Sequence, residues 1–116
     1  MIKNYIYHNP KCSKSRKALE LIKIHNLDVN IILYLKDSIT KGMLKEILKL
    51  SGLSARDIIR SSEIQYIENN LDNPDFSEDE ILAFIIKYPI LLQRPILIFN
   101  NNAIIARPPE NILKII

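Results

Sequence analysis

Cys12 is the one cysteine of the chain, and it lies within a dense run of positive charge. Thiolates are strong nucleophiles, and neighbouring cations lower the pKa of a thiol. The cations crowd the start of an expected helix, ahead of the first acid at Glu20, and are Lys11, Lys14, Arg16 and Lys17. Because helices usually begin with acids instead, this arrangement predicts a negative charge here. That charge would be a Cys12 thiolate, a bound oxyanion or both in turn. The alternative is that Cys12 is a small, inert, buried residue beside a patch of solvated lysines.

Three residues close to Cys12 in the sequence carry groups that can adjust a thiol. The hydroxyls of Ser13 and Ser15 can donate hydrogen bonds to a thiolate. His8 can hydrogen-bond to the thiol or shift its pKa, or it can simply end a strand. His25 falls on the apolar face of the expected helix, where a core or helix-end role is expected.

Three of the five arginines stand at the ends of expected elements. Arg94 precedes Pro95 at the entrance to a strand, and Arg107 precedes Pro108 at the exit of another, while Arg60 ends a short capped helix. Guanidinium groups suit bidentate contact with tetrahedral oxyanions. Since strand ends in a small sheet can lie near the Cys12 loop, these arginines are candidate oxyanion ligands, with surface salt bridges as the alternative.

Residue counts and spacings exclude several classes of site. A single cysteine forms no internal disulfide, and Cys12, His8 and His25 lack metal-ligand spacing, so we expect no metal site and no bound cofactor. Gly42 and Gly52 are ten residues apart, which excludes a P-loop and a dinucleotide-binding turn. The net charge of +3 is mild and spread along the chain, which favours an anionic ligand over nucleic acid.

The size and composition indicate an ordinary globular domain. A chain of 116 residues with 47% hydrophobic and 25% charged residues is typical of a single domain with one core. The longest apolar run, Ile81–Ile86, is too short to cross a bilayer, and Met1–Tyr5 contains no apolar signal segment. These features predict a cytoplasmic protein that does not contact a membrane.

The first third of the chain reads as strand, helix, strand. Ile2–Tyr7 alternates as a short strand, and a helix begins near Cys12 or Ser13 and stops at Asn26. Val29–Leu35 is a nearly continuous apolar run rich in β-branched residues, which is typical of a strand buried on both faces. The three elements predict a right-handed βαβ unit.

The remaining chain predicts a helical segment followed by a hairpin. The helices expected are a stripe of Met43, Leu44, Ile47 and Leu48 ending near Gly52, a capped helix from Ser54 through Arg60, Glu63–Asn69, and a helix opened by the capping box Ser77–Glu80. Strands Ile96–Phe99 and Ala103–Ala106 flank the turn at Asn100–Asn102, and a last helix covers Glu110–Ile116. The prediction is an α/β domain, residues 1–116, whose parallel pair and antiparallel hairpin form four strands, with a helical insertion at about 40–88.

The segment His8–Arg16 resembles the active-site loop of the glutaredoxin-coupled arsenate reductases, which belong to the thioredoxin-like superfamily. The likeness runs along essentially the whole chain, through Ile32–Leu35, Ser54–Arg60, Tyr88–Leu91, Arg94–Ile96 and Arg107–Glu110. The resemblance implies a thioredoxin-like fold with a four-stranded mixed sheet. It also implies roles for seven residues: Cys12 as nucleophile, Arg60, Arg94 and Arg107 as oxyanion ligands, His8 and Ser15 as modifiers of the thiolate, and Pro95 as a cis-proline facing the cysteine.

The same resemblance implies a reaction and partners. Arsenate would form a covalent adduct with Cys12, and glutathione as co-substrate and glutaredoxin as partner would reduce it to arsenite. The alternative is a non-catalytic adaptor similar to the Spx-like regulators, which would bind a protein such as RNA polymerase through the helical insertion. Those regulators typically carry a CxxC switch, whereas here Ser15 stands at the fourth position, where the second cysteine would be. Three arginines around a thiol also favour the enzyme.

Overall fold

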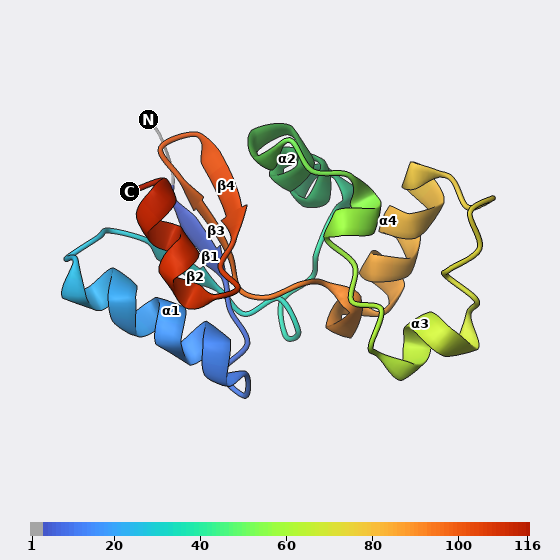
Figure 1. The fold of residues 1–116 in the computed structure, drawn as a ribbon, viewed down its shortest axis with the longest axis horizontal. Helices are drawn as coiled ribbons and strands as arrows, with labels where there is room; N and C mark the ends of the chain where they lie inside the picture. The colour runs from blue at the N-terminus through green and yellow to red at the C-terminus, as the bar shows by residue number, and fades with distance from the viewer. Residues whose placement is uncertain (1–3) are drawn as a thin grey trace. The chain divides into compact units, whose positions relative to one another are not determined.

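The computed structural model describes residues 4–116, which form two compact units (Figure 1). The first unit contains the described residues up to Asp37 together with Arg94–Ile116, and the second contains Ser38–Gln93. The first unit holds the sheet and the second holds only helices and turns, apart from one isolated bridge.

The sheet of the first unit has four strands in the order β2-β1-β3-β4. Their bounds are Tyr5–Tyr7 for β1, Asn30–Ile32 for β2, Ile96–Phe99 for β3 and Asn102–Ile105 for β4. β1 pairs in parallel with β2 and antiparallel with β3, and β3 pairs antiparallel with β4. The α/β class and the mixed sheet are thereby confirmed. Of the predicted strand Ile2–Tyr7, residues 2 and 3 lie outside the described residues.

The predicted burial of the second strand on both faces is wrong. β2 covers three residues of the predicted Val29–Leu35, and its central side chain, Ile31, is 49% exposed. The physical reason is position, because β2 forms an edge of the sheet and has one neighbouring strand instead of two. The chain then turns, with the carbonyl of Leu33 accepting hydrogen bonds from the N–H groups of Lys36 and Asp37.

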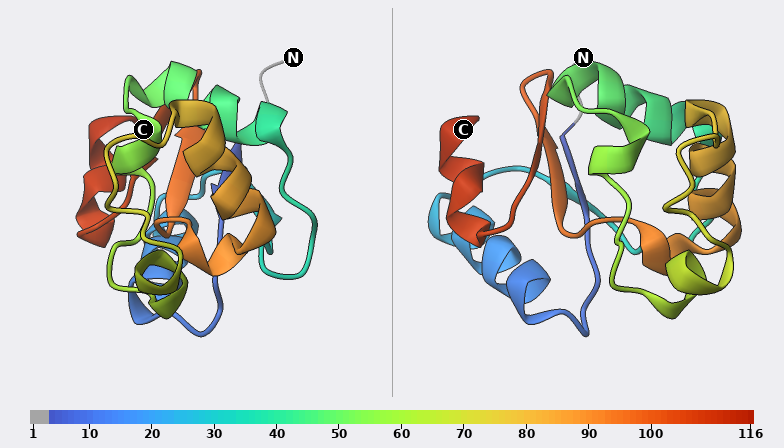
Figure 2. Two further views of the ribbon diagram at one scale, coloured as in Figure 1. Left: turned by 90° about the vertical axis from the view of Figure 1, so that its right-hand side faces the viewer. Right: turned by 45° about the vertical axis from the view of Figure 1, so that its right-hand side comes forward.

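One face of the sheet is covered by α1 (Ser13–Ile24) and the C-terminal segment η3 (Pro109–Lys114), which lie side by side (Figure 2). Their buried side chains meet those of β1 and β3 in one core, formed by Ile6, Ala18, Ile22, Leu97, Ala106 and Ile112. The α-helix predicted for Glu110–Ile116 is a 3₁₀-helix instead. Its turns close from residue i to i+3, as in the bond from the Asn111 N–H to the Pro108 carbonyl at 3.0 Å.

The turn between β3 and β4 uses two asparagines in the left-handed region. Asn100 has φ of 50° and Asn101 has φ of 61°, as a two-residue hairpin turn of type I′ requires. The turn predicted over Asn100–Asn102 is therefore one residue shorter, and β4 begins at Asn102.

The second unit packs five short helical elements around its own core. Their bounds are Lys41–Ser51 for α2, Ala55–Asp57 for η1, Ile64–Glu68 for α3, Glu78–Lys87 for α4 and Pro89–Leu91 for η2. α4 lies at the centre, in contact with α2, η1 and η2, and side chains such as Leu44, Ile47, Ile81 and Ile85 are completely buried. None of the helices in residues 4–116 is long and apolar enough to cross a membrane.

Several helix ends of this unit follow the predictions. Both capping boxes form, at Ser54 with Asp57 and at Ser77 with Glu80, and α2 ends at Gly52 with φ of 74°. The helix predicted to run from Ser54 through Arg60 is shorter than expected and ends at Asp57. It stops because the backbone of the next segment is extended. Ile59 forms a β-bridge with Leu92, and the Arg60 N–H donates to the Leu91 carbonyl at 2.7 Å.

Candidate active site

Cys12 occupies the N-cap of α1, at the end of the loop that follows β1. Its extended backbone, with φ of −95° and ψ of 122°, lets its carbonyl accept the N–H of Arg16 at 3.0 Å while its side chain stays outside the helix. The thiol is half-buried and free. Cys12 therefore lies where the N–H groups of the first helical turn have no carbonyl partner within the helix.

The surroundings of the Cys12 sulfur favour the thiolate. Burial, the largest single influence, raises the pKa of the thiol. Hydrogen bonds from the backbone N–H of Ser15, the guanidinium of Arg94 and the backbone N–H of Lys14, with the charge of Arg94, together outweigh burial. The pKa of Cys12 consequently lies below its ordinary value, as expected for a nucleophilic cysteine and not for an inert buried one.

Asn9 fixes the loop before Cys12, and the sequence analysis missed it. The side chain is 5% exposed, its Oδ1 accepts the N–H of Lys11 at 3.0 Å, and its carbonyl accepts the N–H of Cys12 at 3.0 Å. An Asn-Pro pair is a turn signal, and an asparagine side chain bonds readily to the backbone two residues on. That signal was present at Asn9-Pro10 and identifies Asn9 as the residue that shapes the loop.

His8 and Ser15 are brought together in the buried interior behind the loop. Their Nδ1 and Oγ atoms lie 2.7 Å apart, and the Asn9 N–H also donates to Ser15 Oγ at 3.0 Å. Burial, followed by the charges of Arg16 and Lys23, lowers the pKa of His8, so its ring is neutral at pH 7. Ser15 thus contacts the Cys12 sulfur through its backbone N–H, while its hydroxyl bonds to His8 and Asn9.

Arg94 reaches Cys12 because of the strand order. β3 runs beside β1 with Ile96 opposite Tyr7, so Arg94 enters the sheet next to the point where the Cys12 loop leaves it. The Arg94–Pro95 peptide bond is cis, and so is Arg107–Pro108. Arg107 lies beside Arg94, since its Nη1 donates to the Arg94 carbonyl at 3.2 Å.

Arg60 belongs to the second unit, so its role as an oxyanion ligand stays a prediction. Within that unit its Nε donates to Glu63 Oε1 at 3.1 Å, in a pair whose side chains are 15% and 22% exposed. His25 caps the C-terminal end of α1 and is exposed, so its helix-end role is confirmed and a core role is wrong.

The charge of the chain is divided unevenly, contrary to the expectation of an even spread. Residues 1–37 and 94–116 contain ten lysines and arginines against four acids, whereas residues 38–93 contain six against nine. The unit that carries Cys12 is thus the positive one, which favours anionic ligands. Within residues 4–116, no group of three or more His, Cys, Asp and Glu side chains is arranged to hold a metal ion.

Comparison with known proteins places this chain in a family. The model of the ArsC family matches residues 7–115. An uncharacterized Escherichia coli protein, YfgD, is 40% identical over 112 residues, which are 96% of this chain and 94% of that protein. An arsenate reductase of Neisseria meningitidis serogroup A is 42% identical over 108 residues, which are 92% of each chain.

A solved structure extends the agreement to the backbone. The arsenate reductase of Vibrio cholerae superposes with a TM-score of 0.94 at 38% identity, covering 99% of this chain and 98% of that one. The thioredoxin-like arrangement of the sheet is thereby confirmed. With a family match that covers almost the whole sequence, the chain belongs to the ArsC family.

Proposed function

We propose that this protein is an arsenate reductase that uses Cys12 as nucleophile and glutathione with glutaredoxin as reductant. The observation that carries the proposal is the hydrogen bonding of the Cys12 sulfur to Arg94 and to the first turn of α1. This arrangement stabilises a thiolate and supplies a guanidinium for an oxyanion at the same place. The names of the Neisseria and Vibrio relatives support the same activity.

The first step is nucleophilic attack on arsenic. The Cys12 thiolate, dihydrogen arsenate and one proton give a Cys12–S–arsenate monoanion and water, so one sulfur–arsenic bond forms and one arsenic–oxygen bond breaks. Arg94 lies at the sulfur and Arg107 lies beside Arg94, where both charges offset the negative oxygens. Arg60 is the third proposed ligand.

The electrons for the reduction come from external thiols, because Cys12 is the one cysteine and a hydroxyl at Ser15 cannot exchange with disulfides. The glutathione thiol forms a second sulfur–arsenic bond and releases water. A glutaredoxin thiolate then attacks the glutathione sulfur, a disulfide forms, and the electron pair of the broken sulfur–arsenic bond stays on arsenic, which becomes As(III). Water hydrolyses the remaining Cys12–As(III) bond and releases arsenite.

The test is an arsenite-release assay with three thiol supplies. We expect at most one equivalent of adduct without thiols, multiple turnovers with glutathione and glutaredoxin, and no turnover with Cys12→Ser. Multiple turnovers with thioredoxin and its reductase alone would contradict the glutaredoxin coupling. No arsenite from the wild-type protein in any arm would contradict the activity itself and favour the adaptor alternative.

A further inference from the structure

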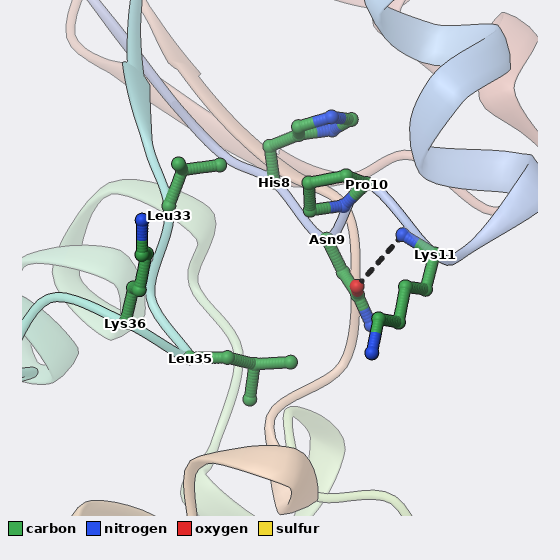
Figure 3. A pocket seen from close by; sticks show the side chains of 7 residues that line it. All are labelled: His8, Asn9, Pro10, Lys11, Leu33, Leu35 and Lys36. Carbon is green, nitrogen blue, oxygen red and sulfur yellow. Dashed lines mark hydrogen bonds between the residues drawn. The ribbon is translucent and has the colours of Figure 1, made fainter.

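A cavity of about 230 Å³ lies beside the Cys12 loop and has no part in the steps above. Its wall on one side is Asn9, Pro10 and Lys11, and on the other side Leu33, Leu35 and Lys36 (Figure 3). His8 lines it as well. All of these residues belong to the sheet-bearing unit.

The position of the cavity follows from the parallel pairing of β1 and β2. Tyr7 and Ile32 are partners at the ends of the two strands, and the His8 N–H donates to the Ile32 carbonyl at 2.9 Å. The loops that follow the two strands therefore leave the sheet at the same end, where the strands finish. A crevice outside the carboxyl ends of parallel strands is a recurrent ligand site in α/β proteins.

The lining defines a ligand that is aliphatic and anionic. Pro10, Leu33 and Leu35 supply apolar surface, and Leu35 is 45% exposed, so a ligand can cover it. Lys11 and Lys36 supply two ammonium groups, and the lining contains no acid. An ammonium favours a carboxylate as its partner.

We propose that this cavity binds the carboxylate-bearing end of the small peptide thiol that resolves the Cys12 adduct. The proposal rests on the proposed function, since it names where its thiol substrate is held. The volume is below the roughly 300–1,000 Å³ of sites for whole drug-sized ligands, so the cavity holds one terminal residue of a tripeptide such as glutathione. Lys11, which lines the cavity, directly precedes Cys12, and successive Cα atoms are about 3.8 Å apart, so the cavity adjoins the residue that carries the nucleophile.

The test measures binding without arsenate and without a reactive thiol, so it is independent of the reductase activity. S-methylglutathione is titrated into ¹⁵N-labelled protein, and the amide shifts give both the location and the Kd. We expect shifts concentrated at residues 8–11 and 33–36. Lys36→Glu should raise the Kd about five- to tenfold, as reversal of an exposed ion pair does, while the matched charge change Lys114→Glu should alter it less than twofold.

Two further measurements separate the contribution of the ligand carboxylates to binding from that of the apolar lining. The diethyl ester of S-methylglutathione should bind the wild-type protein more weakly, and Lys36→Glu should not weaken the binding of this ester further. Leu35→Ser, at an exposed position, should weaken both ligands equally. Equal effects of Lys36→Glu and Lys114→Glu, or shifts confined to other parts of the sheet-bearing unit, would overturn the proposal. Binding as expected without arsenite release would leave this site standing and contradict the proposed function alone.

Discussion

The side chains of His8 and Ser15 are joined by a hydrogen bond of 2.7 Å in the buried interior behind the nucleophile. His8 directly follows β1, and Ser15 lies in the first turn of α1. The bond therefore connects the end of a strand to the start of a helix, with Cys12 between them. A lowered pKa keeps the ring neutral, so the Ser15 hydroxyl can donate to Nδ1 while it accepts the N–H of Asn9.

Ser15→Ala should destabilise the fold more than it changes the thiol. The substitution leaves the buried Asn9 N–H and His8 Nδ1 without a partner, which costs about 1–3 kcal/mol of unfolding free energy. The Ser15 N–H remains, so the pKa of Cys12 should move little. Urea unfolding and thiol titration measure the two effects. Ser13→Ala, at an exposed position, is the control and should change neither the stability nor the pKa of Cys12. A large rise in the Cys12 pKa with unchanged stability would contradict this assignment.

His8 should make the protein less stable in mild acid. Its pKa is lowered in the folded protein, by burial first and then by Arg16 and Lys23, so the unfolded chain takes up the proton more readily. The contribution of neutral His8 is present above the unfolded pKa of about 6.5 and is lost as pH falls from there through the lower folded pKa. Urea unfolding from pH 8 to pH 5 measures the loss, which His8→Gln should reduce.

The Cys12 thiol should react as a thiolate below the ordinary titration range. Iodoacetamide alkylation followed from pH 5 to pH 10 should have its midpoint below the free-thiol value of about 8.5. The same protein in denaturant supplies the reference. Arg94→Ala should raise the midpoint, because the thiolate loses the hydrogen bond and the charge of the guanidinium. A native midpoint at or above the denatured one refutes the stabilised thiolate.

Arg94→Lys should be a severe change in the reductase assay. Lysine keeps the charge and loses the planar fork, so the loss of one charge-assisted hydrogen bond, about 1.5–3 kcal/mol, should lower kcat/KM about ten- to hundredfold. Arg56→Lys is the matched control, since Arg56 uses its fork on the carbonyls of Leu71 and Asn73 in the second unit. That control should lose stability and keep its activity. Unchanged kcat/KM for Arg94→Lys would remove Arg94 from the oxyanion site.

Local signals in the sequence predicted most element boundaries. The serine-to-acid spacing at Ser54 and Ser77 predicted two capping boxes, and Asn26 and Gly52 marked two helix ends, because each signal depends on a few adjacent residues. The helix expected to begin near Cys12 or Ser13 likewise begins at Ser13, with Cys12 as its N-cap. These features need no knowledge of the tertiary structure.

Features that depend on distant neighbours could not be predicted in this way. The apolar residues near Ile31 predict a central strand, but strand order decides exposure, and order is set by the return of β3 beside β1. The bond between Arg107 and the Arg94 carbonyl joins residues brought together by the β3–β4 hairpin. The bonds of the Asn9 carbonyl and N–H could not be predicted, because backbone contacts leave no mark in residue type, whereas the Asn-Pro pair did signal the side-chain bond.

The left-handed turns of this chain have a consequence for its unfolded state. Four asparagines adopt positive φ in residues 4–116, Asn26, Asn70, Asn100 and Asn101, whereas Gly52 is the one glycine to do so there. Asparagine tolerates this region through local hydrogen bonding and, unlike glycine, keeps a side chain that restricts the disordered backbone. The chain thus forms these turns while losing less backbone entropy on folding than a glycine-rich sequence would. Glycine in place of any of these asparagines would reduce the backbone strain of the folded state, but it would also increase the conformational entropy of the unfolded state.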